Sequence, residues 1–140
     1  EIIKDLQTKL GMGVIMITHD LGVVAETCDT VAVMYAGNIV EHAPTNRIFA
    51  NPRHPYTKGL LASLPKIHED QEDLYTIEGS VPSPYNMPAG CRFASRCPFQ
   101  EPICHEKQPD LIEQSDGVKV RCWMYSDQWT GETDKVEAML

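Results

Sequence analysis

The residues of this chain best suited to chemistry are four cysteines in its last third. They lie in a stretch that also holds six of the ten prolines and shows little helical or strand periodicity. Because such a stretch has few large apolar side chains to bury, a hydrophobic core alone does not stabilise it. Four thiolates around a metal centre, or two disulfides, would supply the missing stabilisation. The four residues are Cys91, Cys97, Cys104 and Cys122.

The spacing of these cysteines, Cys-x5-Cys-x6-Cys-x17-Cys, bears on which centre they form. Zinc ribbons and fingers usually pair their ligands as Cys-x2-4-Cys, and this sequence has no such pair. Iron–sulfur clusters accept wider and less regular spacing, because several irons spread the ligand positions apart. The spacing therefore favours a cluster, while zinc and free or disulfide-linked cysteines stay open as alternatives.

Three arginines, Arg92, Arg96 and Arg121, flank three of the cysteines. Their charge would favour thiolates and offset an anionic cluster. The alternative is that they only solvate a surface loop. Trp123 is expected to pack over the cysteine site, whereas Cys28 is expected to be a small buried or half-buried hydrophobe.

Composition and charge limit which cellular compartment and which class of partner are expected. The chain has 140 residues, 42% of them hydrophobic, and a net charge of −8, which argues against nucleic acid or anionic lipid as main partner. No apolar run approaches the roughly 18 residues of a membrane span, and no signal peptide is visible. The expected compartment is therefore the reducing cytosol, where disulfides are rare. This favours the metal interpretation of the cysteines.

His19 is the second candidate for chemistry. It closely follows residues 14–17, a continuous apolar run typical of a strand that is buried on both faces. Open α/β sheets place ligands at the carboxyl ends of their strands, where an imidazole can hydrogen-bond a phosphate oxygen or a reacting water. The alternative is a histidine that caps the strand or the following helix.

The elements that would position these residues follow from periodicity and capping signals. The order of the first 43 residues, with a turn at Gly37-Asn38 before the last strand, is typical of the last part of an α/β unit. Beyond it we expect two short helices, an acidic linker and the cysteine-bearing segment. The expected helices are 1–10, 21–27, 45–49 and 56–64, and the expected strands are 14–17, 30–35 and 39–41.

Several motifs resemble ATPases of the ABC type. His19 matches the histidine that in that family contacts the γ-phosphate of ATP, so the resemblance implies a catalytic and nucleotide-binding role for it. No phosphate loop, signature motif or Walker B strand is present, and the chain is expected to be an inactive C-terminal fragment of such a domain. The motifs are Ile-Thr-His-Asp-Leu at 17–21, Cys28-Asp29, Val31-Ala32-Val33-Met34, Ala36-Gly37 and Ile39-Val40-Glu41.

A second set of motifs is similar to the C-terminal extension of peptide-transporter ATPases, including nickel relatives. Taken alone, His54 and Tyr56 would be a turn and a helix start. The resemblance implies that Cys91, Cys97, Cys104 and Cys122 can bind a [4Fe–4S] cluster. The motifs are Asn51-Pro52-Arg53-His54-Pro55-Tyr56-Thr57-Lys58-Gly59-Leu60-Leu61, Gly79-Ser80-Val81-Pro82, Pro88-Ala89-Gly90-Cys91-Arg92-Phe93, Arg96-Cys97-Pro98, Cys104, Pro109 and Val120-Arg121-Cys122.

Together these resemblances imply the C-terminal part of the ATP-binding subunit of a prokaryotic peptide-import ABC transporter. Residues 1–43 would end the nucleotide-binding domain, 44–124 would form the extension, and 125–140 would be a flexible tail. The full-length protein would use ATP and Mg²⁺ at the cytoplasmic face of the membrane. Its partners would be a second ATPase subunit, transmembrane permease subunits and, indirectly, a peptide-binding protein. A stand-alone iron–sulfur or metal-binding module without ATPase activity is the alternative.

Overall fold

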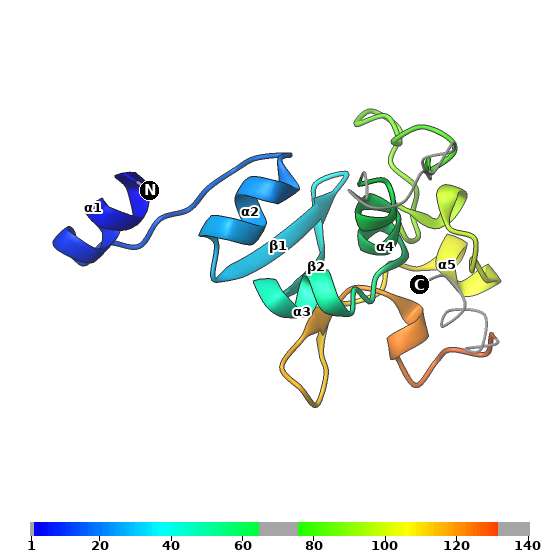
Figure 1. Ribbon diagram of the computed structural model, residues 1–140. Helices are drawn as coiled ribbons and strands as arrows, with labels where there is room; N and C mark the ends of the chain where they lie inside the picture. Colours follow the sequence, from blue (N-terminus) through cyan, green and yellow to red (C-terminus); the bar gives the residue numbers. More distant parts are fainter. Residues whose placement is uncertain (1, 65–75, 132–140) are drawn as a thin grey trace, which may run out of the picture.

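The computed structural model describes residues 2–64 and 76–131 (Figure 1). Helices and an antiparallel sheet are both present, so the α/β prediction holds at this coarse level. Most of the predicted acidic linker and residues 132–140 lie outside the described residues. The elements are α1 Ile2–Leu10, α2 Leu21–Thr27, β1 Thr30–Tyr35, β2 Asn38–Pro44, α3 Thr45–Ala50, α4 Pro55–Ala62, η1 Ala94–Arg96, α5 Pro102–Glu106, β3 Ile112–Glu113, β4 Lys119–Val120 and η2 Trp123–Tyr125.

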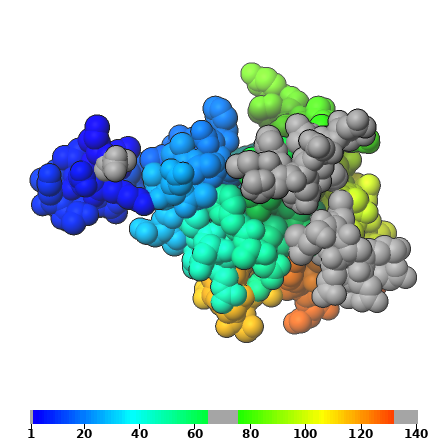
Figure 2. All heavy atoms as spheres, in the orientation of Figure 1, coloured from blue at the N-terminus to red at the C-terminus, as the bar shows by residue number. Residues whose placement is uncertain are grey.

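Residues 2–20 lie at one end of the molecule, where Nζ of Lys4 in α1 donates to the carbonyl of Glu26 in α2. Figures 1 and 2 show α1 projecting from the body, joined to α2 by an extended segment. None of the α1 residues is buried. The strand predicted over residues 14–17 is wrong, since that segment is extended but unpaired, and Ile15 and Ile17 are 95% and 97% exposed. A strand needs a neighbour for its backbone hydrogen bonds, and no described strand lies beside this run.

The predicted hairpin is present, and its turn defines the register of the sheet. Strands β1 and β2 pair antiparallel, from Thr30 opposite Pro44 to Tyr35 opposite Asn38. The turn residues are Ala36 and Gly37, one position earlier than predicted, with φ angles of 47° and 84°. Two consecutive residues with positive φ match the twist that two-residue hairpins require. Alanine at the first of them is an unfavourable choice, because its Cβ resists the left-handed conformation.

The cysteine-bearing segment is built onto this hairpin. The sheet has the strand order β1-β2-β4-β3, with β4 antiparallel to β2 and to β3. Glu41 and His42 lie opposite Val120 and Lys119, and the N–H of Arg121 donates to the carbonyl of Val40 at 2.8 Å. Cys122 thus follows directly from a strand whose position is determined by β2.

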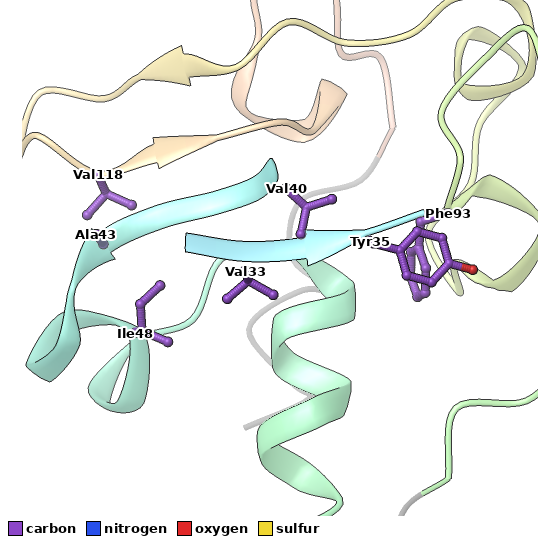
Figure 3. Packing of buried hydrophobic residues seen from close by; sticks show 7 residues of the cluster. All are labelled: Val33, Tyr35, Val40, Ala43, Ile48, Phe93 and Val118. Carbon is purple, nitrogen blue, oxygen red and sulfur yellow. The ribbon is translucent and has the colours of Figure 1, made fainter. Parts of the chain in front are cut away.

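The hydrophobic core joins the hairpin, α3 and the irregular segment in one cluster (Figure 3). Phe93, next but one after Cys91, is only 3% exposed and meets Tyr35 edge to face at 5.1 Å between ring centroids. Such aromatic pairs add to the free energy gained by burial of their area. The remaining buried members of the cluster are Val33, Val40, Ala43, Ile48 and Val118.

The three arginines near the cysteines bind backbone carbonyls. Arg96 donates through Nε and Nη2 to the carbonyls of Glu78 and Ile77, each at 2.8 Å. Arg121 donates to the carbonyls of Ile39 and Pro109 at 3.0 Å, and Arg92 donates to that of Ala36. Most of their donors therefore hold irregular chain segments together. Binding of the backbone is a role that the sequence did not suggest.

Regular elements account for little of residues 76–131. The longest is α5, of 5 residues, and two of the four strands of the sheet are here, each of 2 residues. No helix within the described ranges has the length and apolar character needed to cross a bilayer.

The hairpin turn gives a test of this register. Ala36→Asn should raise the free energy of unfolding by a fraction of the roughly 1–2 kcal/mol that the left-handed conformation costs alanine, because asparagine tolerates it. Gly37→Ala should do the opposite, since φ is +84° and a Cβ would lie 3.1 Å from Nη1 of Arg92. Urea unfolding measures both, and Gly13→Ala, which meets nothing within 4 Å, is the control. Equal midpoints for all three variants would contradict the turn geometry.

Candidate functional site

The four cysteines line a single small cavity, although they come from four separate parts of the irregular segment. Cys104 lies in α5, Cys97 directly follows η1, and Cys122 directly precedes η2. The wall of the cavity is otherwise mostly apolar. It is completed by His54, Pro55, Phe93, Ala94, Phe99, Trp123, Met124 and Trp129.

A close backbone approach brings Cys91 beside Cys104. The N–H of Cys91 donates to the carbonyl of Cys104 at 2.7 Å. A Cβ on Gly90 would lie only 2.2 Å from that same carbonyl oxygen, a separation that real Cβ atoms do not show. Glycine at position 90 is therefore required by the site itself, because it lets the two segments touch.

Backbone N–H groups are aimed at the cysteine sulfurs. The N–H of the residue two positions on donates to the sulfur in three cases, Phe93 to Cys91, Phe99 to Cys97 and Met124 to Cys122. For Cys104 the backbone N–H of Glu101 acts in the same direction. Hydrogen bonds of this kind favour a thiolate over a thiol.

Burial of the thiols has the opposite effect on their pKa values, and it is the larger effect. It raises the pKa of Cys97 to about 12, and it raises the pKa of Cys91, Cys104 and Cys122 as well. Neighbouring thiols raise these pKa values further, because four negative charges in one cavity repel one another. Of the flanking arginines, only Arg121 lowers one of them, that of Cys91. Without an added cation the site therefore holds neutral, unreactive thiols.

The geometry bears on the three alternatives from the sequence, which are an iron–sulfur cluster, a zinc site, and free or disulfide-linked cysteines. None of the five cysteines is in a disulfide. Within residues 2–64 and 76–131, no three or more Cys, His, Asp or Glu side chains are placed to hold one metal ion. The arrangement thus gives no support to a mononuclear zinc site, and no metal site is formed in the described residues. The four cysteines nevertheless line one cavity.

Trp123 covers this site as predicted. It is buried with Ala94 and Cys104, and its Nε1 donates to the carbonyl of Lys107 at 3.0 Å. Trp129 packs against the same cluster, but its buried Nε1 has no hydrogen-bond partner. Sequence reasoning missed Trp129, because a lone tryptophan in a polar stretch gives no signal of where it packs.

A buried carboxylate holds the His54 segment against the sheet. Glu41, on β2, is 1% exposed, and its two oxygens accept from the N–H groups of Arg53 and His54, each at 2.9 Å. Burial raises the pKa of Glu41, and the two backbone hydrogen bonds partly oppose that rise. Arg53 also pairs with Asp116, and its carbonyl accepts from the hydroxyl of Tyr125 at 3.1 Å. Glu41 is a second residue that sequence reasoning missed.

His54 is the N-cap of α4 and is 1% exposed. Its Nδ1 accepts from the N–H of Tyr56 at 3.0 Å, and its ring lies 5.6 Å from that of Phe93. Burial lowers the pKa of His54 to about 3. The structural role that this histidine and Tyr56 would have as a helix start is confirmed.

His19 lies far from the cysteines. It is exposed in the extended segment between α1 and α2, and Figure 1 shows this segment at the left of the molecule, whereas α5, which carries Cys104, lies at the right. The next residue, Asp20, caps α2 by accepting from the N–H groups of Gly22 and Val23. The structure thus brings the four cysteines together but does not bring His19 to them.

Comparison with known proteins gives a consistent result. Residues 40–104 match the family model described as the C-terminal region of oligopeptide/dipeptide transporters. The chain is 48% identical over 128 residues to the oligopeptide transport ATP-binding protein AppD of Bacillus subtilis, covering 91% of this chain and 39% of that protein. It is 45% identical over 124 residues to the dipeptide transport ATP-binding protein DppD of the same organism, covering 89% and 37%.

The chain therefore spans less than two fifths of the length of these relatives. Both relatives are ATP-binding proteins of transport systems, as the sequence motifs indicated. The alternative of a stand-alone iron–sulfur module finds no support in these comparisons.

The buried imidazole makes stability depend on pH. The unfolded chain binds a proton at His54 near pH 6.5, whereas the folded chain does so only near pH 3. Between these values the unfolded state holds the extra proton, so stability is lost as pH falls below about 6.5. We expect His54 to contribute up to about 1.4 kcal/mol per pH unit to this slope.

Urea unfolding from pH 6.5 to 4 measures the slope. His54→Asn is the matched variant, because asparagine keeps an N-cap acceptor but does not titrate. Its slope should be shallower than that of the wild-type chain. Identical slopes would show that His54 is not buried in its neutral form.

Proposed function

We propose that this chain is the C-terminal part of the ATP-binding subunit of a peptide-import ABC transporter. The observation that carries the proposal is the similarity of most of the chain to ATP-binding proteins of oligopeptide and dipeptide transport. Residues 1–43 would end the nucleotide-binding domain, and residues 44–124 would form the C-terminal extension. In the complete protein, hydrolysis of ATP with Mg²⁺ would drive the import of a peptide.

His19 would act in hydrolysis by contacting the γ-phosphate and the attacking water. Its exposure and its place just before the capped start of α2 support this role, because the imidazole is free to meet a nucleotide. Phosphoryl transfer depends chiefly on positioning and charge stabilisation, to which a well-placed hydrogen bond contributes. The chain lacks a phosphate loop, so we expect no hydrolysis by these 140 residues alone.

The partners would be a second ATPase subunit and transmembrane permease subunits at the cytoplasmic face of the membrane, and indirectly a peptide-binding protein. Exposed apolar side chains in α1 and in the segment after it support packing against the rest of a nucleotide-binding domain. They are Ile2, Ile3, Leu6, Leu10, Met12, Val14, Ile15 and Ile17.

The cysteine site would hold a [4Fe–4S] cluster that cross-links the segments of the extension. Four features fit such a group: four thiols on one cavity, an apolar wall, backbone N–H groups aimed at the sulfurs, and the unpartnered Nε1 of Trp129. When bound, a cluster would supply the cationic irons that four buried thiolates need, and it would cross-link four chain segments. The separation of the site from His19 supports a structural role for it.

The function proposal is tested by His19→Ala in the full-length ATPase. We expect ATP turnover to fall by about a hundredfold or more while nucleotide binding persists, since only the contact to the reacting phosphate is lost. Steady-state hydrolysis and equilibrium nucleotide binding are measured in parallel, with His105→Ala as the matched control. Hydrolysis that survives in His19→Ala would overturn the assignment.

The cluster proposal is tested by anaerobic purification. We expect a brown protein with about four irons and four sulfides per chain. Cys97→Ser should lose most of the iron, whereas Cys28→Ser, which lies outside the cavity, should keep it. A colourless, iron-free protein, with or without a bound zinc ion, would overturn the proposal.

A further inference from the structure

Two tryptophans line the four-cysteine cavity, and the structure holds them in different ways. Trp123 is 8% exposed, and its Nε1 donates to the carbonyl of Lys107 at 3.0 Å. Trp129 packs against the cluster of Ala94, Cys104 and Trp123, but its buried Nε1 has no hydrogen-bond partner among the described residues. Buried polar groups are nearly always hydrogen-bonded. The indole ring of Trp129 is therefore held by packing alone, without the bond that fixes Trp123.

The backbone that carries Trp129 is tied to the body of the molecule only as far as Tyr125, whose hydroxyl donates to the carbonyl of Arg53 at 3.1 Å. Beyond it, the hydrogen bonds that the structure describes for residues 126–131 are all local, with partners within residues 123–129. Segments with few tertiary contacts open locally at a lower free energy than the core. Residues 126–131, named here the Trp129 cover, are thus anchored to the body chiefly by one side chain.

The chain turns back onto the indole ring at Gly131. A Cβ there would lie 2.4 Å from Cζ2 and 2.8 Å from Cε2 of Trp129, closer than real Cβ atoms approach. Glycine at this position therefore lets the backbone touch the ring. A side chain at position 131 would displace the ring or the backbone, so it disturbs the Trp129 cover without removing Trp129.

We propose that the Trp129 cover is movable, and that metal ions and thiol-reactive molecules reach the four cysteines when Trp129 leaves its place. While the ring is in place, it excludes water from a cavity of neutral, unreactive thiols. When the ring leaves, its Nε1 gains water as an acceptor, which favours opening. Trp123 stays in place, because its departure would break the bond to Lys107.

The experiment measures alkylation of each cysteine of the full-length protein by N-ethylmaleimide. Chelation and reduction under anaerobic conditions first convert all cysteines to free thiols, so the test needs no bound metal. Peptide mass spectrometry follows the four cavity cysteines separately, and Cys28, which lies outside the cavity, is the internal control. Urea below the unfolding transition should change the rates little, because local opening exposes little surface.

We expect Trp129→Ala to speed alkylation of the cavity cysteines by about tenfold or more, because the ring that excludes water is lost. Trp129→Phe should stay within about threefold of the wild-type rate, since the N–H that it removes has no partner. Trp123→Phe is the matched comparison. It leaves the carbonyl of Lys107 without its donor, and it should speed alkylation more than Trp129→Phe does.

Gly131→Ala should also speed alkylation while keeping every side chain of the cavity, and it decides the question if Trp129→Ala does not fold. Unchanged rates in folded Trp129→Ala and Gly131→Ala overturn the inference. Rates that rise steeply with urea also overturn it, because they would show that the cysteines are reached only by global unfolding.

Discussion

The buried carboxylate of Glu41 is the interaction on which the arrangement of this molecule depends. It lies on β2 opposite Val120 of β4 and accepts the N–H groups of Arg53 and His54. One side chain therefore links the hairpin to the start of α4, while its own backbone pairs with the strand that precedes Cys122. Burial of a carboxylate costs free energy unless it is hydrogen-bonded. The two backbone donors offset that cost only in this one arrangement.

In the cysteine cavity, burial of charge also costs free energy, but the groups of the described residues do not fully offset this cost. Backbone N–H groups point at the sulfurs, yet burial still keeps the thiol pKa values raised. An apolar filling would be the simpler way to stabilise such a segment, and the chain instead places four thiols there. The arginines that would offset thiolate charge are mostly bound to carbonyls of the backbone. The described residues thus supply little positive charge to the cavity, and its buried thiols are neutral.

The features of the fold that could be predicted from the sequence are those that depend on neighbouring residues. The helix over residues 21–27 and the β1–β2 hairpin follow from neighbouring residues, and the structure has them, while the helix predicted from residue 56 begins one residue earlier, at Pro55. The predicted strand over 14–17 failed because a strand is defined by its partners. The turn was misplaced by one residue because Ala36 adopts a conformation that alanine disfavours.

The same distinction between local and long-range signals applies to the cysteine site. Its membership could be predicted from the number, spacing and setting of the cysteines. The two-residue strand β4, the close approach at Gly90 and the roles of Glu41 and Trp129 could not be predicted, because each depends on contacts between residues far apart in sequence. Short segments such as these carry too few residues to show a periodicity.

His19 and the cysteines lie in different physical settings. His19 sits in an exposed segment whose apolar neighbours Ile15 and Ile17 are also exposed. The cysteine site is completed within the chain, by four segments, a sheet and a capped helix. A group that reacts with a nucleotide needs the first kind of setting, since the ligand must enter and leave. A structural cross-link needs a setting that is completed within the chain, because it links segments that would otherwise separate.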